Sequence, residues 1–517
     1  MIASAIATTS SAQVLRVDDD QTSATQNGLS WATAYPRLEQ ALAEALVKNT
    51  NGMPGDDISE IWVAQGRYEP TTNPTDRTAS FELLPGVSVY GGFDGTETSR
   101  AARAGLFDQT LLSGDIDANP ATIAQNSYHV VLVDGAIVGG SLTGHFRLDG
   151  FRVMFGAAVS GSPFLDQTIG GGALVRDVPL GTEVVIANTR FESCFAVAGG
   201  GLFAKNSAYV GLVRSSFVSC VGYSATPDGS ATPPTGVGGG MGATGCKEVY
   251  AYNTAFTNNR ASYGGGAWVQ PSGSVLEGAQ PQMRFVNCLL AQNTAIAGGG
   301  AAVWSSFNTP AVFDFCTIAN NTASSVGDVP PPTLRYGGAG IHTFDGSHLA
   351  VRSSIIWGNV DQNSVADSIG GAGIGSGPAP VTVVTYSDVA LPGGAVWSTP
   401  GSSANINQDP LFVSASTGNF RISANSPCID VADDIVLHSL VGAPNYGPAP
   451  TSEFTRSLGD ILDVDEDGVF ETEYLPLDLD LLNREMDIST VPNGPRDFAI
   501  SNFVADMGCY EYPLGIP

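Results

Sequence analysis

Runs of three glycines recur along the middle of the chain. They begin at Gly170, Gly199, Gly238, Gly264 and Gly298, and a Gly-Gly-Ala-Gly variant begins at Gly337. Their unequal spacing indicates loops of different length inserted into a unit of roughly 25 residues. Periodicity of this kind is typical of repeat folds, in which each unit packs on its neighbours around one continuous core.

A second element recurs between the glycine runs: an apolar residue followed, three positions later, by Asn or Cys. After each glycine run, apolar residues alternate with a period of two, which predicts short strands with one face turned inward. The second element comprises Phe191 with Cys194, Phe217 with Cys220, Phe256 with Asn259, Leu290 with Asn293, Ile318 with Asn321, and Ile356 with Asn359.

Each unit is too short to bury its own apolar face, so stacking against neighbouring units is the route to a core. Glycine suits a corner that needs positive φ or a close backbone approach. Asn at one turn position in successive units can form a hydrogen-bonded ladder. The framework of a leucine-rich repeat and the four-strand blades of a propeller are both missing. The sequence therefore predicts an all-β, right-handed parallel β-helix.

Both ends of this rod need covers, because an open end exposes core and strand edges. After Pro36, a segment with Leu38, Leu42, Ala45 and Leu46 on one face predicts a short capping helix. We expect residual secretory signal or a disordered segment at 1–13, the β-helix with its N-terminal cap at 14–395, and a loop-rich C-terminal cap at 396–517.

The charge balance excludes some partners. The chain has 22 Lys and Arg against 50 Asp and Glu, a formal net charge of −28. Such a charge repels nucleic-acid phosphates, so we expect no nucleic-acid partner. We also expect no membrane span, because no run of about 18 apolar residues occurs. An acidic surface suits a protein outside the cell, and nothing here indicates an oligomeric state.

The cysteines follow the repeat. Cys194 and Cys220 occupy the Asn position in successive units, and Cys288 and Cys316 both stand two residues before the repeat's apolar residue. Stacked neighbours come within disulfide range of each other, so either pair could be bridged in an oxidising compartment. A buried apolar thiol in the ladder explains the same pattern, and both interpretations stay open.

Several segments together resemble the bacterial choice-of-anchor Q family of secreted or surface-anchored β-helix proteins, in the pectin-lyase-like superfamily. The glycine and apolar-x-x-Asn elements are also similar to repeats of chlamydial polymorphic outer-membrane proteins, which are adhesins. The resemblance implies an extracellular, cell-surface or periplasmic bacterial protein. Because the closing motif lies just before Pro517, we expect release rather than anchorage. The segments that carry the resemblance are 27–35, 61–68, 90–98, 148–151, 409–412, 426–430 and 506–511.

An acidic loop near the C-terminus predicts a structural Ca²⁺ site. Carboxylates at positions 1, 3 and 5 and a carbonyl at position 7 suit a calcium loop of EF-hand type, although Tyr474 stands where the closing Glu is expected. A solvated acidic turn is the alternative. The proposed ligands are Asp463, Asp465, Asp467, the Val469 carbonyl, Glu471 and Glu473.

Aromatic residues recur at the second position after the glycine runs, which should point outward, and two more, Trp304 and Phe344, stand two places further on. In an exposed row they could pack against sugar rings or a partner chain. Inserted loops, such as 225–236 or 271–280, could instead fold over this face. The candidate ligand-binding residues are Phe203, Trp268, Trp304, His342 and Phe344.

The acids of the main coils are few and share no register position, whereas hydrolases on sugars need paired carboxylates. The sequence therefore favours a secreted or surface binding and adhesion module, for polysaccharide or another surface. The alternative is a polysaccharide lyase or glycoside hydrolase on the same fold, because fold alone does not decide function.

Overall fold

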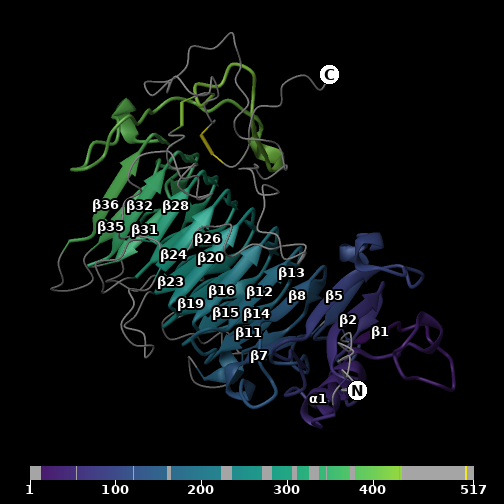
Figure 1. Cartoon of the computed structure of the whole chain (residues 1–517). Coiled ribbons are helices and arrows are strands. Elements are labelled where there is room, and N and C mark those ends of the chain that lie inside the picture. Colours follow the sequence, from purple (N-terminus) through teal and green to yellow (C-terminus); the bar gives the residue numbers. More distant parts are fainter. Residues whose placement is uncertain are drawn as a thin grey trace, which may run out of the picture.

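The structure is a computed structural model that describes residues 13–432 and 507–508, apart from 54, 120–121, 160–164, 223–235, 271–281, 305–310, 325–336, 345, 373–378 and 430. In this part of the chain, short strands stack in four parallel sheets along one axis (Figure 1). One coil runs through β10 (Ala157–Ala158), β11 (Ala173–Arg176), β12 (Glu183–Ala187) and β13 (Arg190–Glu192), one strand in each sheet. The predicted right-handed parallel β-helix is confirmed.

The two largest sheets lie next to each other around the coil. The eleven-stranded sheet contains β1 (Gln13–Val17), β2 (Ile58–Ala64), β5 (Ser88–Phe93), β8 (Phe146–Asp149), β12, β16 (Tyr209–Val213), β20 (Glu248–Tyr252), β24 (Gln282–Val286), β28 (Ala311–Asp314), β32 (His348–Arg352) and β36 (Val381–Thr385). The ten-stranded sheet contains β3 (Gly66–Tyr68), β6 (Thr110–Ser113), β9 (Arg152–Met154), β13, β17 (Ser216–Val218), β21 (Ala255–Thr257), β25 (Leu289–Ala291), β29 (Thr317–Ala319), β33 (Ile355–Trp357) and β37 (Asp388–Val389).

Two smaller parallel sheets complete the coils, and an antiparallel hairpin follows them. The nine-stranded sheet contains β4 (Phe81–Glu82), β7 (Val131–Asp134), β11, β15 (Leu202–Lys205), β19 (Met241–Thr244), β23 (Ala267–Gln270), β27 (Ala301–Val303), β31 (Ile341–Phe344) and β35 (Ile369–Ala372). The seven-stranded sheet contains β10, β14 (Phe195–Ala196), β18 (Val221–Gly222), β22 (Arg260–Ala261), β26 (Thr294–Ala295), β30 (Thr322–Ala323) and β34 (Val360–Asp361). The hairpin is β38 (Phe412–Ser414) with β39 (Asn419–Ile422).

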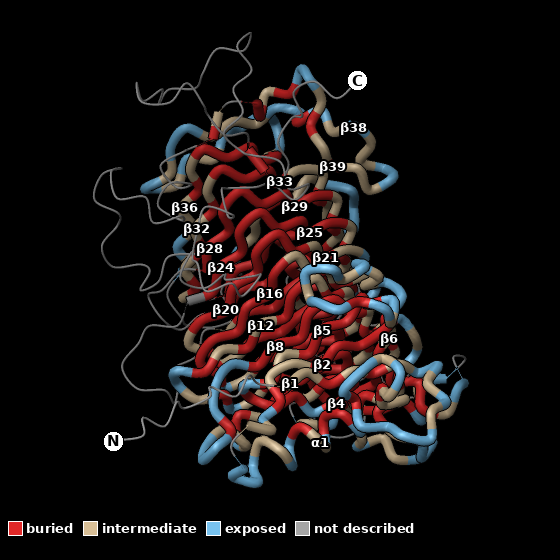
Figure 2. The backbone as a smooth tube through the Cα atoms, turned by 45° about the vertical axis from the view of Figure 1, so that its right-hand side comes forward, coloured by how far each residue is buried: buried red, intermediate tan, exposed pale blue. Residues whose placement is uncertain are grey.

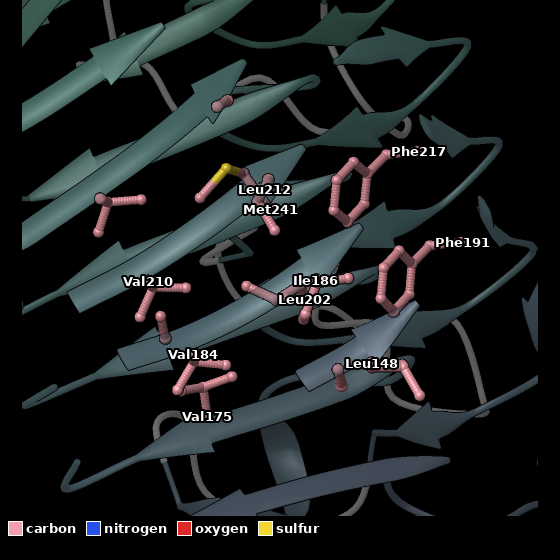
Figure 3. Packing of buried hydrophobic residues seen from close by; sticks show 14 of the residues in the cluster. Leu148, Val175, Val184, Ile186, Phe191, Leu202, Val210, Leu212, Phe217 and Met241 are labelled. Atoms are coloured by element: carbon pink, nitrogen blue, oxygen red, sulfur yellow. The ribbon is translucent and has the colours of Figure 1, made fainter. Parts of the chain in front are cut away.

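The core is one continuous column of apolar side chains inside the coils. Figure 3 shows side chains from facing strands pointing into this interior. Equivalent residues of successive coils stack directly: the rings of Phe191 and Phe217 lie 4.8 Å apart, and those of Phe217 and Phe256 4.9 Å. The repeated apolar residue therefore builds the core, as its period predicts.

The glycine runs form the corner between the seven-stranded and nine-stranded sheets. The first glycine of a run has positive φ, 66° at Gly264 for example. The second has no room for a side chain: a Cβ on Gly265 would lie 2.5 Å from the carbonyl oxygen of Gly299 in the next coil. Both predicted reasons for glycine, its backbone conformation and its close approach, apply at this corner.

The predicted asparagine ladder is also present. Asn259, Asn293, Asn321 and Asn359 stack in successive coils, and each of the first three donates its side-chain Nδ2 to the Oδ1 of the next, over 2.9–3.0 Å. All four side chains are buried. The ladder satisfies polar groups inside the coil and ties each coil to the next.

The cysteines stack as predicted, but the described ones form no disulfide. Neighbouring register pairs place Cys194 beside Cys220 and Cys288 beside Cys316. The six cysteines in the described part of the chain are buried free thiols. Of the two interpretations of these cysteines, the structure supports the buried thiol.

The N-terminal end carries the predicted cap. Helix α1 (Leu38–Thr50) buries Leu38, Ala41, Leu42 and Ala45 against the first coil. Leu46, which was expected on the same face, is 40% exposed, because the buried face extends toward Ala41 instead. Exposed residues concentrate at the two ends of the rod, whereas residues of the coils between them are mostly buried (Figure 2).

At the other end, the chain leaves the regular coils after β37. The 3-10 turns Pro392–Gly394 and Ala415–Thr417 and the hairpin β38–β39 provide the loop-rich cap that the sequence predicts. Residues 1–12 lie outside the described part, and the domain boundaries at 13 and 395 stay predictions. Among the described helices, none combines the length and the apolar character needed to cross a membrane.

Candidate functional site

The predicted aromatic residues line up across the strands of one sheet. Strand pairing in the nine-stranded sheet aligns Phe203 with Gly242, then with Trp268, Ala302 and His342. These residues belong to the outer face, because they cluster with one another and not with the interior column. The period-two pattern therefore assigned their direction correctly.

Of the two alternatives for this face, exposed or covered, burial applies to four of the five candidates. Phe203, Trp268, His342 and Phe344 are each 3% exposed or less, and Trp304 alone is open, at 41%. The Phe203 and Trp268 rings stack, and the Trp304 ring lies on Phe344 with centroids 4.9 Å apart. Burial lowers the pKa of His342 to about 4, so its ring stays neutral in the cluster. A continuous exposed aromatic stripe is therefore not present.

The predicted calcium ligands, Asp463 to Glu473, lie outside the described residues. In the described part, one acidic group, Asp18, Asp19 and Asp20, brings three carboxylates within 4.8 Å of one another. Asp18 accepts a hydrogen bond from the Asp20 backbone, and Asp19 accepts one from the Arg67 backbone. These bonds account for the turn at the end of β1, and we assign it no ligand.

A groove of about 390 Å³ runs along the corner between the eleven-stranded and ten-stranded sheets. It crosses the turns of successive coils, and the 3-10 turn Phe107–Gln109 forms one side of it. No pattern in the sequence predicted this groove. Its lining comprises Phe107, Asp108, Phe151, Asn188, Thr189, Arg190, Arg214, Ser215, Ser216, Asn253 and Ala255.

Three side chains form a column on the floor of the groove. Asn188, Arg214 and Asn253 occupy the same turn position in consecutive coils, with φ of 45°, 47° and 46°. Coils repeat about every 4.8 Å, so the column presents one polar side chain per coil over about 10 Å. A left-handed residue at this turn lets the chain bend from one sheet into the next.

Arg214 differs from most arginines of the coils. Arg103 and Arg147 pair with Asp149, and Arg284 and Arg352 pair with Asp314. The Arg214 guanidinium makes no hydrogen bond or ion pair with any residue that the structure describes, and its Nε is buried. A half-buried guanidinium without a counter-ion makes this part of the groove favourable for an anionic group.

Asn253 adds a second unsatisfied group to the same wall. Its side chain is 5% exposed, and its Oδ1 has no hydrogen-bond partner among the described atoms. Buried polar atoms are nearly always hydrogen-bonded in native proteins, so this atom needs a further donor, such as an ordered water or a ligand group that reaches it. Hydroxyl groups are suitable donors.

The remaining charges in the groove leave it locally basic. Arg190 donates to Glu192 over 2.8 Å, and Glu192 is shared with Arg152 at 3.0 Å. Asp108 is the acid among the described lining residues, and it is exposed. The two arginines and one aspartate of this lining contrast with the strongly acidic chain as a whole.

The acids of the coils serve structure. Burial alone would raise the pKa of Asp314, but Arg352 and Arg284 outweigh it and hold that pKa below its usual value. The pKa of Asp149 is lowered in the same way, by Arg103 and Arg147 against the effect of burial. These carboxylates are charged, paired and buried, and therefore unsuited to general acid catalysis.

The sequence alone gave a partial signal for the groove. Arg214 follows β16 at the position where Asn188 and Asn253 follow their own strands, so its place in the column can be read from the repeat. Its lack of an acidic neighbour depends on how the 3-10 turn at Phe107 packs against the turns of the coils. The repeat does not predict that packing.

Comparisons with known proteins do not assign the site. No protein-family model matches the sequence, and no curated protein matches it. Among solved structures, a pectate lyase, Pel9A, is 13% identical, with a TM-score of 0.38, and the match covers 82% of this chain and 93% of that one. Escherichia coli YbhC is 11% identical, with a TM-score of 0.24, over 73% and 72%. The fold assignment rests on the sheet topology itself.

Proposed function

We propose that this protein is a binding module for an acidic polysaccharide, which lies along the groove at the corner of the two largest sheets. The observation that carries the proposal is that Arg214 and Asn253, at the same turn position of adjacent coils, have a guanidinium and an Oδ1 without partners among the described residues. A carboxylate on the ligand would pair with the first, and a sugar hydroxyl would donate to the second.

The shape of the groove supports a polymer rather than a small molecule. Its polar side chains repeat once per coil along the axis of the rod, so an extended chain could meet several of them in turn. Phe107 and Ala255 provide apolar surface at its sides, on which the faces of sugar rings can pack. Because the groove runs along the axis of the rod, the same site could bind polymer chains of different length.

Binding is favoured over catalysis by the chemistry of the lining. A glycosidase requires two carboxylates across the scissile bond, and Asp108 is the acid that the described lining offers. The alternative is a polysaccharide lyase or glycoside hydrolase. A lyase could use an arginine of this lining as its base but would also need carboxylates to hold Ca²⁺, and a hydrolase would need a second carboxylate. We propose a location outside the cell or on its surface, where such polymers occur.

Replacing Arg214 by Gln should weaken binding of polygalacturonate about tenfold to a hundredfold, because a hydrogen bond to a charged group contributes about 1.5–3 kcal/mol. Isothermal titration calorimetry measures the change. Arg260→Gln is a matched control, since Arg260 is exposed on the seven-stranded sheet. Fully methyl-esterified polygalacturonate, which lacks the charge, should bind the wild-type chain as weakly as the acid form binds Arg214→Gln.

Equal binding of the charged and esterified polymers, or a loss in Arg260→Gln matching that in Arg214→Gln, would contradict the proposal. The enzymatic alternative has its own readout. A lyase acting on polygalacturonate produces an unsaturated sugar that absorbs in the ultraviolet. Steady formation of that product by the wild-type chain would replace the binding proposal with the enzymatic one.

We also propose that the acidic loop from Asp463 to Glu473 holds a structural Ca²⁺, on the sequence pattern alone. Calorimetric titration with CaCl₂ should give binding heat in the wild-type chain and none in the double variant Asp465→Ala, Asp467→Ala. Titration with MgCl₂ is the control, because Mg²⁺ demands a smaller octahedral shell. An unchanged calcium titration in the double variant would remove the site from this loop.

A further inference from the structure

One buried carboxylate connects the last coil to the segment that follows the coils. Asp388 begins β37 and is fully buried. Its Oδ1 accepts a hydrogen bond from the Gln408 backbone N–H at 3.1 Å, and its Oδ2 accepts one from the Cys428 thiol at 3.4 Å. We call residues 406–432 the cap segment, so both contacts of this carboxylate come from the cap segment.

The cap segment folds back over the outside of the coils. Phe420 packs on Leu289 and Ala319, which belong to the ten-stranded sheet. Ile422, Cys428 and Ile429 join a cluster with outward side chains of the eleven-stranded sheet, such as Val286. The side-chain Nδ2 of Asn320 donates to the Ala415 carbonyl at 3.3 Å. Apolar packing holds most of this segment, and Asp388 lies at the point where the segment leaves the rod.

Asp388 differs in its surroundings from Asp149 and Asp314, two other buried acids of the coils. Asp149 and Asp314 each face two arginines. No cation faces Asp388 in the described part of the chain. The neighbouring strand contributes Ile355, Ile356 and Trp357, and the cap segment contributes the Cys428 thiol and the acid Asp409, whose charge opposes ionisation of Asp388.

We propose that Asp388 is a proton-controlled latch, which holds the cap segment on the last coil when its carboxyl is neutral and loosens it when the carboxyl is charged. Burying an uncompensated charge is unfavourable, whereas a neutral carboxyl keeps both contacts at no such cost. This device is independent of the proposed polysaccharide site, and its test uses no ligand.

The direction of the pH effect follows from linkage. Burial raises the pKa of Asp388 from 3.8 to about 6, with a smaller contribution from Asp409. A group whose pKa is raised in the docked state stabilises docking fully below its free pKa, and that stabilisation is lost as the pH rises through the docked pKa. Docking should therefore weaken between about pH 4 and pH 6 and stay constant above, by about a hundredfold, since each pKa unit is tenfold.

Hydrogen exchange of single amides tests the latch in the full chain. The Ile406 amide donates to the Ser387 carbonyl and the Val389 amide donates to the Ile406 carbonyl, so both amides report the docked state. After correction for the intrinsic exchange rate, their opening equilibrium should rise about a hundredfold from pH 4 to pH 7. It should be independent of pH in Asp388→Asn, which keeps the shape and the acceptor for Gln408. The ladder amides of Asn293 and Asn321 are the internal control and should not respond.

A pH-independent opening in the wild-type chain, or the same pH response in Asp388→Asn, would overturn the latch. A second variant keeps the test decisive if Asp388→Asn does not fold. Cys428→Ala removes a donor to the charged carboxylate, so the midpoint of loosening should move to higher pH. A midpoint that stays in place in Cys428→Ala would assign the pH response to another group and would reject the proposal.

Discussion

Replacing Gly265 by alanine should lower the free energy of unfolding by about 3 kcal/mol, because the added methyl group overpacks a closed corner. Its Cβ would lie 2.5 Å from the Gly299 carbonyl oxygen and 2.7 Å from that of Thr294. Both atoms are backbone of the neighbouring coil, so no side chain can rotate away. Relief requires separation of two coils that share hydrogen bonds in every sheet. Urea unfolding followed by tryptophan fluorescence measures the loss.

Gly337→Ala is the matched control. Gly337 stands directly before a glycine run and has no atom closer to its Cβ position than the Asp367 carboxylate at 3.9 Å. The equivalent position holds Ala297 and Tyr263 in the preceding coils, with which it forms a continuous line of bridges. We expect a change within about 0.5 kcal/mol for this variant. Equal losses in the two variants would show that coil separation is not what limits the Gly265 position.

The repeat predicted the fold because both of its elements are direct consequences of stacking. A glycine run is needed wherever backbone from two coils meets within about 3 Å, and the apolar residue before each Asn must enter the core. The Gly-Gly-Ala-Gly variant is consistent with this requirement for glycine. Ala339 replaces the middle glycine where the following coil is the last of the nine-stranded sheet. The constraint thus relaxes where regular stacking ends.

The candidate site was far less predictable. The outward direction of Phe203 and Trp268 follows from strand period, but their burial depends on what lies over the sheet, which the period does not describe. The lack of an acidic partner for Arg214 was not predictable for a related reason. A pairing between an arginine and an acid depends on side chains from different coils, and the unequal loops between the repeats obscure that register in a single sequence.

Replacing Asn293 by alanine should destabilise the fold by about 3–4 kcal/mol, through lost hydrogen bonds in a dry interior. Asn293 is fully buried and makes four side-chain bonds. Its Nδ2 donates to the Phe256 carbonyl at 2.8 Å and to the Asn321 Oδ1 at 3.0 Å. Its Oδ1 accepts from the backbone N–H and the side-chain Nδ2 of Asn259, at 2.9 and 3.0 Å. Alanine removes these bonds from Phe256 and Asn259 in one neighbouring coil and from Asn321 in the other, at a fully buried position.

Asn258→Gly isolates this contribution from backbone conformation. Asn258 precedes the ladder residue Asn259, is exposed, and has a φ of 57° that glycine adopts without strain. We expect it to change the free energy of unfolding by less than about 0.5 kcal/mol. A comparable loss in Asn258→Gly would place the effect in the turn rather than in the ladder.

Asn293→Cys completes the series. The first two coils of the column carry Cys194 and Cys220 at this position, and each thiol donates to a backbone carbonyl of the coil before it. Cysteine should therefore recover part of the stability that alanine loses, since one donor is restored while the link to the next coil stays broken.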